Sequence, residues 1–359
     1  MAERLPIVVY GATGYTGRLV SRVLASKGVA FAIAGRDKKK LSDLALTLGK
    51  PPEVIVAGLD DAAALEKMAA RARVVLDCAG PFEKYGKPVQ DAALAAKSHF
   101  MDITGEHSYM RATWSRDAEA KARGVALINA VGFDVVPTDA AAAIAAEAAG
   151  APIESVKIAF STKGARPTQG TTRSMIALAH MGSLAWVNGK WVPEKVGAEK
   201  WTVDFQPPVG RRTVIAAPWG DVATAPRTTG ARNVRTFMAL PPAVARFAPL
   251  MKLTRLPGAG ALLERWVRSL PEGPTPEQRA KGRSAIHAEA TGAKGTRAAW
   301  VTCGDGYDFT AISASLCAMR AAEGDFTGKG ALTPVQAFGA QWLLDSLKKE
   351  GAASWALVP

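Results

Sequence analysis

The feature that most constrains the fold is a glycine-rich turn near the N-terminus, set between a short apolar run and an amphipathic segment. Residues 6–10 (PIVVY) are continuously apolar, which is typical of a strand buried on both faces of a parallel sheet. The turn GATGYTG follows at residues 11–17, and residues 18–24 carry apolar side chains at helical spacing. A strand, a glycine turn and a helix in this order are the context that a phosphate-binding turn requires.

The three glycines of this turn have separate roles. Gly11 permits the tight turn off the strand, Gly14 allows backbone to approach a pyrophosphate, and Gly17 lets the helix pack closely on the sheet. The first amides of the helix then face the anion. The context predicts that this turn binds a dinucleotide, and the alternative is a turn with a purely structural role. The predicted binding residues are Gly11, Thr13, Gly14, Tyr15, Thr16 and Gly17.

The end of the next predicted strand, residues 30–34, bears on which dinucleotide the turn holds. An NAD site places an acidic residue there to bind the ribose 2′-hydroxyl, whereas this chain has Gly35 and Arg36, with lysines close behind. A guanidinium suits a 2′-phosphate because its forked donors match phosphate oxygens. The pattern favours NADPH. There are two alternatives. Asp37, which lies one residue after the position of the acidic residue in NAD sites, would bind the ribose, or Arg36 would be a solvated residue of the next helix.

Further strands are predicted at residues 53–57, 73–77, 98–103 and 124–130, alternating with helical segments. Asp60 follows the first of them and is expected near the adenine. The small residues Cys78, Ala79, Gly80 and Pro81 follow the second, where a cofactor's central part can lie against backbone. The alternation predicts an α/β fold with a doubly wound parallel Rossmann sheet. The Ala-rich residues 140–149 are expected to form a packed surface helix.

After about residue 151 the pattern changes to alternating strands with Gly and Pro turns, which predicts a second, mixed α/β domain. Strands are expected at residues 155–162, 201–205, 212–217, 233–239, 284–291 and 296–301, and helices at 310–319 and 334–348. The second of these helices has a plausible start at Thr333 and Pro334.

Composition bears on partners and location. Lys and Arg exceed Asp and Glu by 45 to 32, a formal net charge of +13. That surplus suits a polyanion or an anionic membrane, but no nucleic-acid-binding signature is present, and a host with a basic proteome is an equal explanation. The three cysteines and four histidines lack disulfide or metal spacing, so no metal is expected. Without a secretory signal or a membrane-spanning run, a cytoplasmic location is expected.

Residues 240–270 are apolar and cationic. They contain one carboxylate, Glu264, against Arg246, Lys252, Arg255, Arg265 and Arg268. Short helices of this kind lie in a membrane interface or form the mouth of an apolar cavity. Peripheral contact with the inner membrane surface is therefore a hypothesis, with ordinary core helices or a homodimer surface as the alternatives.

Taken together, these segments resemble the saccharopine dehydrogenase-like oxidoreductases, on the side of the bacterial trans-acting enoyl reductases. The matching motifs are GATGYTG at 11–17, AGR at 34–36, CAGPF at 78–82, YG at 85–86, DITGE at 102–106 and GFDVVP at 132–137, with weaker matches at 170–174, 219–221, 273–283 and 332–334. The resemblance implies an NAD(P)-binding Rossmann domain at residues 1–137, a substrate domain at 138–330, and a C-terminal helix within 331–359 that returns to the first domain.

Hydride transfer needs a cofactor placed against its substrate and a source of a proton. Tyr85 is a candidate donor to an enolate, and Glu106 or His107 to a C=N substrate. Each has a structural alternative, since Tyr85 can simply pack, Glu106 can cap a helix, and Asp134 can be structural in its turn.

The resemblance and the apolar second half predict an NADPH-dependent reductase of an apolar, α,β-unsaturated or lipid-like substrate. One alternative is a saccharopine-type imine reductase or amino-acid dehydrogenase, whose carboxylate substrate would need cations such as Arg166, Arg173 and Arg297. Another is a non-catalytic NADP-binding sensor or lipid-associated protein.

Overall fold

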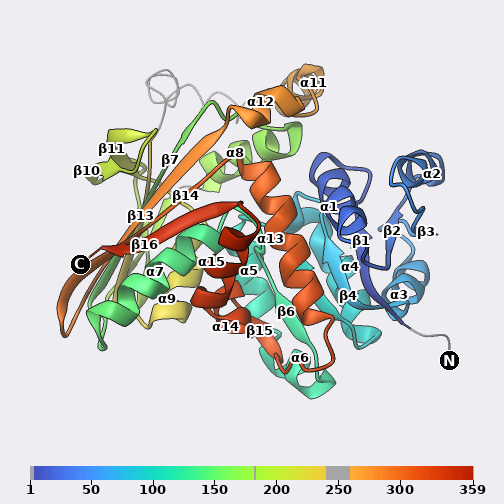
Figure 1. The fold of residues 1–359 in the computed structure, drawn as a ribbon, viewed down its shortest axis with the longest axis horizontal. Helices are drawn as coiled ribbons and strands as arrows, with labels where there is room; N and C mark the ends of the chain where they lie inside the picture. The colour runs from blue at the N-terminus through green and yellow to red at the C-terminus, as the bar shows by residue number, and fades with distance from the viewer. Residues whose placement is uncertain (1–3, 182, 240–258, 359) are drawn as a thin grey trace. The chain divides into compact units, whose positions relative to one another are not determined.

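The computed structural model describes residues 4–181, 183–239 and 259–358. The chain forms two compact units (Figure 1). The first comprises Met1–Ala140 and Tyr307–Ala353, and the second comprises Ala141–Gly306 and Ser354–Pro359. The expected substrate domain, residues 138–330, included a segment that the structure groups with the first unit.

The first unit holds a sheet in which the described residues contribute seven strands, in the order β15-β6-β5-β4-β1-β2-β3. The resolved pairings in this sheet are parallel, and Ile7, Val8 and Val9 of the central strand are fully buried. The strand order reverses direction between β1 and β4, which is the topological switch point of a doubly wound sheet. The predicted fold class is confirmed. The strands are β1 (Leu5–Tyr10), β2 (Phe31–Gly35), β3 (Glu53–Val56), β4 (Ala72–Asp77), β5 (His99–Asp102), β6 (Ala126–Ile128) and β15 (Gly330–Leu332).

Helices alternate with these strands along the chain (Figure 1). They are α1 (Tyr15–Ser26), α2 (Lys38–Leu46), α3 (Ala62–Ala70), α4 (Phe82–Ala95), α5 (His107–Trp114) and α6 (Asp117–Arg123). The next helix, α7 (Val136–Ala149), was expected at the surface, and that expectation was wrong. Only Glu147 of α7 is exposed, because alanine side chains allow close packing around most of the helix.

A C-terminal segment completes the first unit. Helix α13 (Gly306–Ala321) precedes β15, and α14 (Pro334–Phe338) and α15 (Ala340–Lys349) follow it. The helix expected over residues 334–348 is therefore two helices, which separate at Gly339. Its predicted start is confirmed by a capping box between Thr333 and Gln336.

The second unit is built on a mixed sheet, also as predicted. The order is β10-β11-β12-β7-β13-β14-β16, with β8 paired to β12 and β9 paired to β8. The β12 and β7 strands are parallel, whereas β13 runs antiparallel to both of its neighbours, β7 and β14. The strands are β7 (Ser155–Lys163), β8 (Ser183–Val187), β9 (Lys190–Glu194), β10 (Lys200–Phe205), β11 (Gly210–Ala216), β12 (Asn233–Met238), β13 (Arg283–Gly292), β14 (Gly295–Cys303) and β16 (Ala353–Val358).

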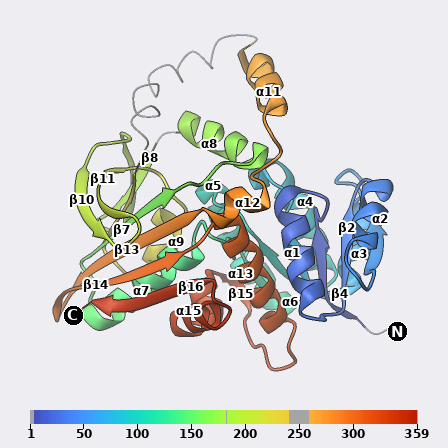
Figure 2. The same cartoon turned by 45° about the horizontal axis from the view of Figure 1, so that its top comes forward.

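Residues 141–149 of α7 belong to the second unit, together with α8 (Gln169–Met181), α9 (Asp221–Thr229), α11 (Ala259–Ser269) and α12 (Pro276–Ala280). Figure 2 shows α8 and α11 beside each other. Of the apolar, cationic stretch at 240–270, residues 240–258 lie outside the described residues. In the parts of the chain that the structure describes, no helix is both long and apolar enough to cross a membrane.

Two carboxyl groups are buried side by side in the first unit. Asp77 ends β4 and Asp102 ends β5, in direct register, and both are fully buried. Asp102 accepts hydrogen bonds from the backbone amides of Thr104 and Ala130 and from the side chain of Asn129. Burial nevertheless raises the pKa of Asp102 to about 7 and that of Asp77 well above its ordinary value. The folded protein therefore holds protons that the unfolded chain releases.

Because the folded protein retains these protons, the sign of the pH dependence of its free energy of unfolding can be predicted. A carboxyl group whose folded pKa is raised stabilises most below its unfolded pKa, and that contribution is lost as the pH rises through the folded pKa. The free energy of unfolding of the native protein, minus that of Asp102→Asn, should fall between about pH 4 and about pH 7, by at most about 1.4 kcal/mol per pH unit. Urea unfolding at a series of pH values measures the difference.

The comparison with a variant is needed because His99 has the opposite effect. Burial lowers the pKa of His99 to about 4, so its contribution grows with pH in the same window. This contribution cancels in the difference. The exposed Glu66→Gln variant is the matched control, and a constant difference for Asp102→Asn across the pH range would contradict the assignment.

Helices α4 and α5 meet at a glycine. A Cβ atom on Gly86 would lie 2.6 Å from Cζ of Tyr109, whose ring is nearly fully buried. Only a residue without a side chain leaves room for this ring, so Gly86 sets how closely α5 approaches α4.

Gly86→Ala should therefore destabilise the protein by about 1–3 kcal/mol, because overpacking outweighs the better helix propensity of alanine. In a Tyr109→Leu background the same change should become neutral or stabilising, since the ring is gone. Chemical denaturation of the four proteins of this cycle measures the coupling. Equal costs in both backgrounds would show that the contact does not limit the packing.

Candidate functional site

The loops that follow β1, β4, β5 and β6 emerge at the same edge of the parallel sheet, because parallel strands share the direction of their carboxyl ends. The β1 and β4 loops touch at the switch point, where a Cβ on Gly11 would lie 2.8 Å from Cβ of Ala79. The backbone amide of Cys78 also donates to the carbonyl of Tyr10 at 3.0 Å. The structure thus brings together the glycine turn and the residues 78–81 that the sequence singled out.

The N-terminus of α1 differs from those of its neighbours. Carboxylates accept the first amides of α2, α3 and α4, from Asp37, Asp61 and Glu106 respectively. Among the described residues, α1 has no side-chain cap and no acidic residue in its first turn. The N-cap of α1 is Gly14, so the glycine turn of residues 11–17 leads directly into the helix, which is the arrangement of a phosphate-binding turn.

A cation accompanies this turn. The guanidinium of Arg18 donates to the carbonyl of Thr13 at 2.7 Å, so the side chain folds back over the turn. A cation beside a helix N-terminus fits the pyrophosphate of a dinucleotide.

The residues that the sequence predicts for the adenosine side of the cofactor lie at the ends of β2 and β3. Arg36 is exposed directly after β2, and Asp60 is exposed after β3. Both act electrostatically on Tyr10, whose hydroxyl donates to the carbonyl of Ala57 and whose pKa is raised to about 12, first of all by burial. Asp37 caps α2 by accepting the amide of Lys40 at 3.1 Å. The structure therefore engages Asp37 in the helix, while Arg36 is open to a phosphate.

Glu106 joins the β5 loop to α4. Its two carboxylate oxygens accept the amides of Phe82 and Glu83, at 3.1 and 2.7 Å, directly after the turn that ends at Pro81. Sequence reasoning raised the possibility of a helix cap, and the helix that Glu106 caps is α4 rather than its own helix, α5. Its carboxylate thereby holds the position of the 78–81 turn.

The remaining candidates lie around this cap. Tyr85 is half-buried on α4, with Nζ of Lys84 5.0 Å from its ring centroid. His107 is buried, and burial lowers its pKa, so the imidazole is neutral. Asp134 lies against Gly105, and desolvation followed by the charge of Glu106 raises its pKa to about 6. Burial also raises the pKa of the Cys78 thiol, which makes Cys78 a poor nucleophile.

One residue at this edge escaped sequence reasoning. Tyr307, at the start of α13, meets the ring of Tyr15 edge-on, with centroids 5.2 Å apart. Further along α13, Thr310 accepts the amide of Phe133 at 3.0 Å, and Ser313 donates to the carbonyl of Val131 at 2.9 Å. Helix α13 therefore lies against the loops after both β1 and β6. No motif marks Tyr307, because it enters the site only through this tertiary contact.

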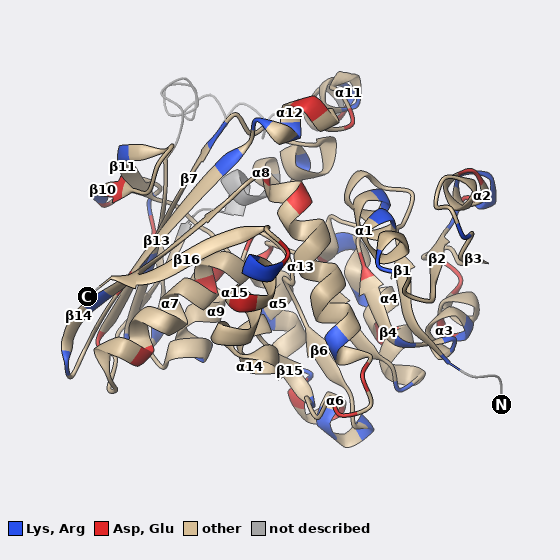
Figure 3. Ribbon diagram, in the orientation of Figure 1, with Lys and Arg blue, Asp and Glu red and all other residues tan. Residues whose placement is uncertain are grey.

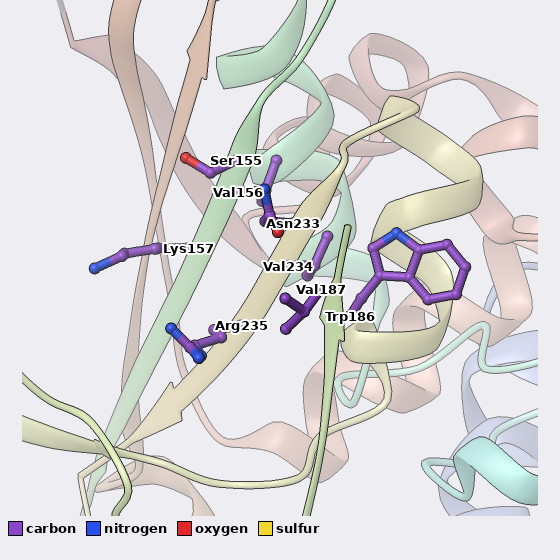
Figure 4. Close-up of a pocket in the computed structure, with 8 residues that line it drawn as sticks. All are labelled: Ser155, Val156, Lys157, Trp186, Val187, Asn233, Val234 and Arg235. Carbon is purple, nitrogen blue, oxygen red and sulfur yellow. The ribbon is translucent and has the colours of Figure 1, made fainter. Parts of the chain in front are cut away.

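The second unit has a pocket between β7, β8 and β12 (Figure 4). Its two cations are engaged, since Lys157 pairs with Glu199 and Arg235 pairs with Glu194 and Glu199. The pocket therefore has no unneutralised charge to recognise a ligand and was not one of the expected sites. It is lined by Ser155, Val156, Lys157, Trp186, Val187, Asn233, Val234 and Arg235.

The proposed carboxylate clamp of the imine-reductase alternative also lies in the second unit. Arg173 forms a two-pronged ion pair with Glu264, at 3.0 and 2.9 Å. Arg166 is exposed after β7, and Arg297 donates to the carbonyl of Thr296. Within the described residues, no group of three or more His, Cys, Asp or Glu side chains is arranged to hold a metal ion.

Comparison with known proteins agrees with this geometry. Residues 7–128 match the family model of the saccharopine dehydrogenase NADP binding domain. Among curated relatives, the trans-acting enoyl reductase of Mycobacterium bovis (strain BCG / Pasteur 1173P2) is 38% identical over 145 residues, 38% of this chain and 35% of that protein. The saccharopine dehydrogenase-like oxidoreductase of Bos taurus is 34% identical over 151 residues, 37% of this chain and 35% of the relative.

A third relative, the lipid droplet localized protein of Caenorhabditis elegans, is 34% identical over 149 residues, 38% of this chain and 35% of that protein. The matched region thus spans about a third of the length of these relatives.

The likeness to solved structures extends over the whole chain. Apo saccharopine dehydrogenase (L-Glu forming) from Saccharomyces cerevisiae has a TM-score of 0.68 at 14% identity, covering 98% of this chain and 99% of that one. At this identity the likeness concerns the fold. The matched residues and the strand order agree: residues 7–128 of the first unit, on a doubly wound parallel sheet, are similar to the saccharopine dehydrogenase NADP binding domain.

Proposed function

We propose that this protein is an NADPH-dependent reductase of an apolar, α,β-unsaturated or lipid-like substrate, acting in the cytoplasm at the inner membrane surface. The observation that carries the proposal is the glycine turn that leads into α1 from the central strand, together with the exposed Arg36 after β2, in the region that matches an NADP binding domain. Two aromatic pairs, Tyr15 with Tyr307 and Phe133 with Phe309, join the loops after β1 and β6 to α13.

The residues at the edge fit the cofactor from end to end. Arg36 would bind the 2′-phosphate, the first amides of α1 would bind the pyrophosphate, and the 78–81 turn would support the central part. Bound NADPH supplies a hydride for the reduction of a double bond. The chain's own contribution is to orient cofactor and substrate, to exclude water and to deliver a proton.

The surroundings of the β6 loop favour an apolar substrate. Phe133, in the loop after β6, meets the buried ring of Phe309 edge-on at 5.8 Å, and Tyr15 meets Tyr307 at the start of the same helix. Aromatic surfaces of this kind bind apolar groups and do not compensate a carboxylate. Arg173, which the imine-reductase alternative would use, is already paired with Glu264.

Two relatives support the same direction over the region that they share with this chain. One is named a trans-acting enoyl reductase and another a lipid droplet localized protein. The first name supports a C=C bond as the target, and the second supports a lipid environment.

For the proton, we propose the hydroxyl of Tyr85 as the donor to the enolate. Glu106 acts as a positioning residue in this proposal, because both of its oxygens already accept amides of α4. Protonating Glu106 to make it a donor would weaken that cap.

Loss of the 2′-phosphate contact should be selective. Arg36→Ala should raise the KM for NADPH about 10- to 100-fold, the effect of a hydrogen bond to a charged group, and leave the KM for NADH unchanged. Steady-state kinetics with both cofactors measure the ratio. Lys87→Ala, at an exposed position on α4, is the control, and equal losses for the two cofactors would contradict the assignment.

The reaction is tested by following NADPH oxidation with medium-chain trans-2-enoyl thioesters and with imines formed from amino acids and 2-oxo acids. Turnover is expected with the enoyl thioesters only. Tyr85→Phe should lower kcat by about a hundredfold, the lower range for loss of an acid catalyst, without changing the Kd for NADPH.

Tyr109→Phe is the matched control, because the hydroxyl of Tyr109 is buried without a hydrogen-bond partner among the described residues. Turnover of imines alone would establish the saccharopine-type alternative, and NADPH binding without turnover of either class would establish a sensor. A loss in Tyr307→Phe but not in Tyr85→Phe would move the proton donor to α13.

A further inference from the structure

Helix α11 exposes two large apolar side chains to solvent. Leu262 is 71% exposed and Trp266 is 51% exposed, and they lie one turn apart on the same side of the helix. Val267, on the opposite side, is only 1% exposed. The helix thus buries one apolar stripe and presents another, which an ordinary surface helix does not do.

The contacts with α8 hold α11 in this orientation. Glu264 of α11 receives both prongs of the Arg173 guanidinium of α8, and Arg268 also donates to it at 2.9 Å. The two arginines lower the pKa of Glu264 to about 2. Gln169 of α8 donates to the carbonyl of Leu270 at 2.7 Å, just beyond the end of α11. The acidic side chain of α11 is therefore neutralised on the α8 side, away from the exposed stripe.

Positive charge remains on the outward side. Arg265 lies between Leu262 and Trp266 in the sequence, is exposed, and has no ion pair among the described residues. Lys and Arg are spread over many of the described elements of this protein (Figure 3), in keeping with its net charge of +13. The side of α11 formed by Leu262, Arg265 and Trp266, here called the α11 face, thus combines apolar insertion groups with an unpaired cation.

We propose that the α11 face docks the protein on an anionic phospholipid bilayer. The inference deepens the proposed function, because a protein held at a bilayer surface meets a lipid-like substrate there. A leucine and a tryptophan beside an arginine are the composition of a helix that lies in a membrane interface. The tryptophan ring is suited to the boundary between headgroups and acyl chains, and the net positive charge steers the protein to an anionic surface.

The size of the α11 face argues for a bilayer rather than a second protein. A stable protein interface buries about 800 Å² on each partner, whereas a large aromatic side chain buries at most about 250 Å². Two apolar side chains fall well below that requirement. They are sufficient for reversible attachment to a surface that also attracts the charge of the whole molecule.

The test is co-sedimentation of the full chain with vesicles of phosphatidylcholine alone or of phosphatidylcholine and phosphatidylglycerol in equal parts. The native protein should bind the anionic vesicles at low salt, and high salt should weaken binding. The double variant Leu262→Ala/Trp266→Ala should lower the partition coefficient by at least about tenfold, because the apolar side chains supply the insertion. Arg265→Glu should lower it as well, and Arg265→Lys should restore it.

Helix α2 offers matched controls in the other unit. Leu46 is 78% exposed and Lys39 is exposed on the same helix, so Leu46→Ala and Lys39→Glu change the same chemistry without touching α11. Their partition coefficients should stay within twofold of that of the native protein. Equal losses of vesicle binding in the α2 and α11 variants would show that binding does not depend on the α11 face, and would overturn the proposal.

Two further outcomes would also overturn it. One is a failure of the native protein to bind anionic vesicles. The other is a double variant that changes the oligomeric state in sedimentation velocity but not the partition coefficient, which would make the α11 face a homodimer contact. NADPH oxidation with a water-soluble enoyl thioester, measured without vesicles, should be unchanged in the double variant. That assay separates a failure of docking from a failure of the proposed reductase activity.

Discussion

The structure of the first unit depends on the double-sided parallel pairing of β1. This strand is in register with β2 on one side and β4 on the other, and its central side chains are fully buried. Because both faces of the strand are covered, its polar and flexible residues are confined to its ends. The glycine turn at the carboxyl end of β1 is thus placed where the strand order reverses, and the neighbouring loops gather around it.

The helices at this edge of the sheet differ in how their N-termini are capped. Asp37, Asp61 and Glu106 satisfy the first amides of α2, α3 and α4, and so remove those helix ends as anion sites. Helix α1 instead begins at the glycine turn, and its N-cap Gly14 has no side chain. The same carboxylate of Glu106 that satisfies α4 ties the loop after β5 to the turn after β4. The hydrogen bonds of Glu106 that cap α4 therefore also position the turn on which the central part of the cofactor would lie.

The second unit differs from the first in its strand pairing and in the charges that its strands carry. Its mixed sheet pairs β7 in parallel with β12 and antiparallel with β13. Side chains alternate between the two faces of every strand, so Arg235 and Lys157, which are in register, lie on the same face. Lys157 and Arg235 on these strands are neutralised by glutamates. On α11, ion pairs to α8 fix the helix and leave Leu262 and Trp266 exposed.

The sequence by itself determined the features that local chemistry encodes. The glycine turn, the apolar run before it and Arg36 after the second strand specify a dinucleotide-binding unit, because each role is set by residues a few positions apart. Tertiary structure decided what depends on distant partners: that Glu106 caps α4 rather than α5, that Tyr307 meets Tyr15, and that α7 is buried. Such contacts cannot be predicted from the periodicity of the sequence, because packing joins segments that lie far apart along the chain.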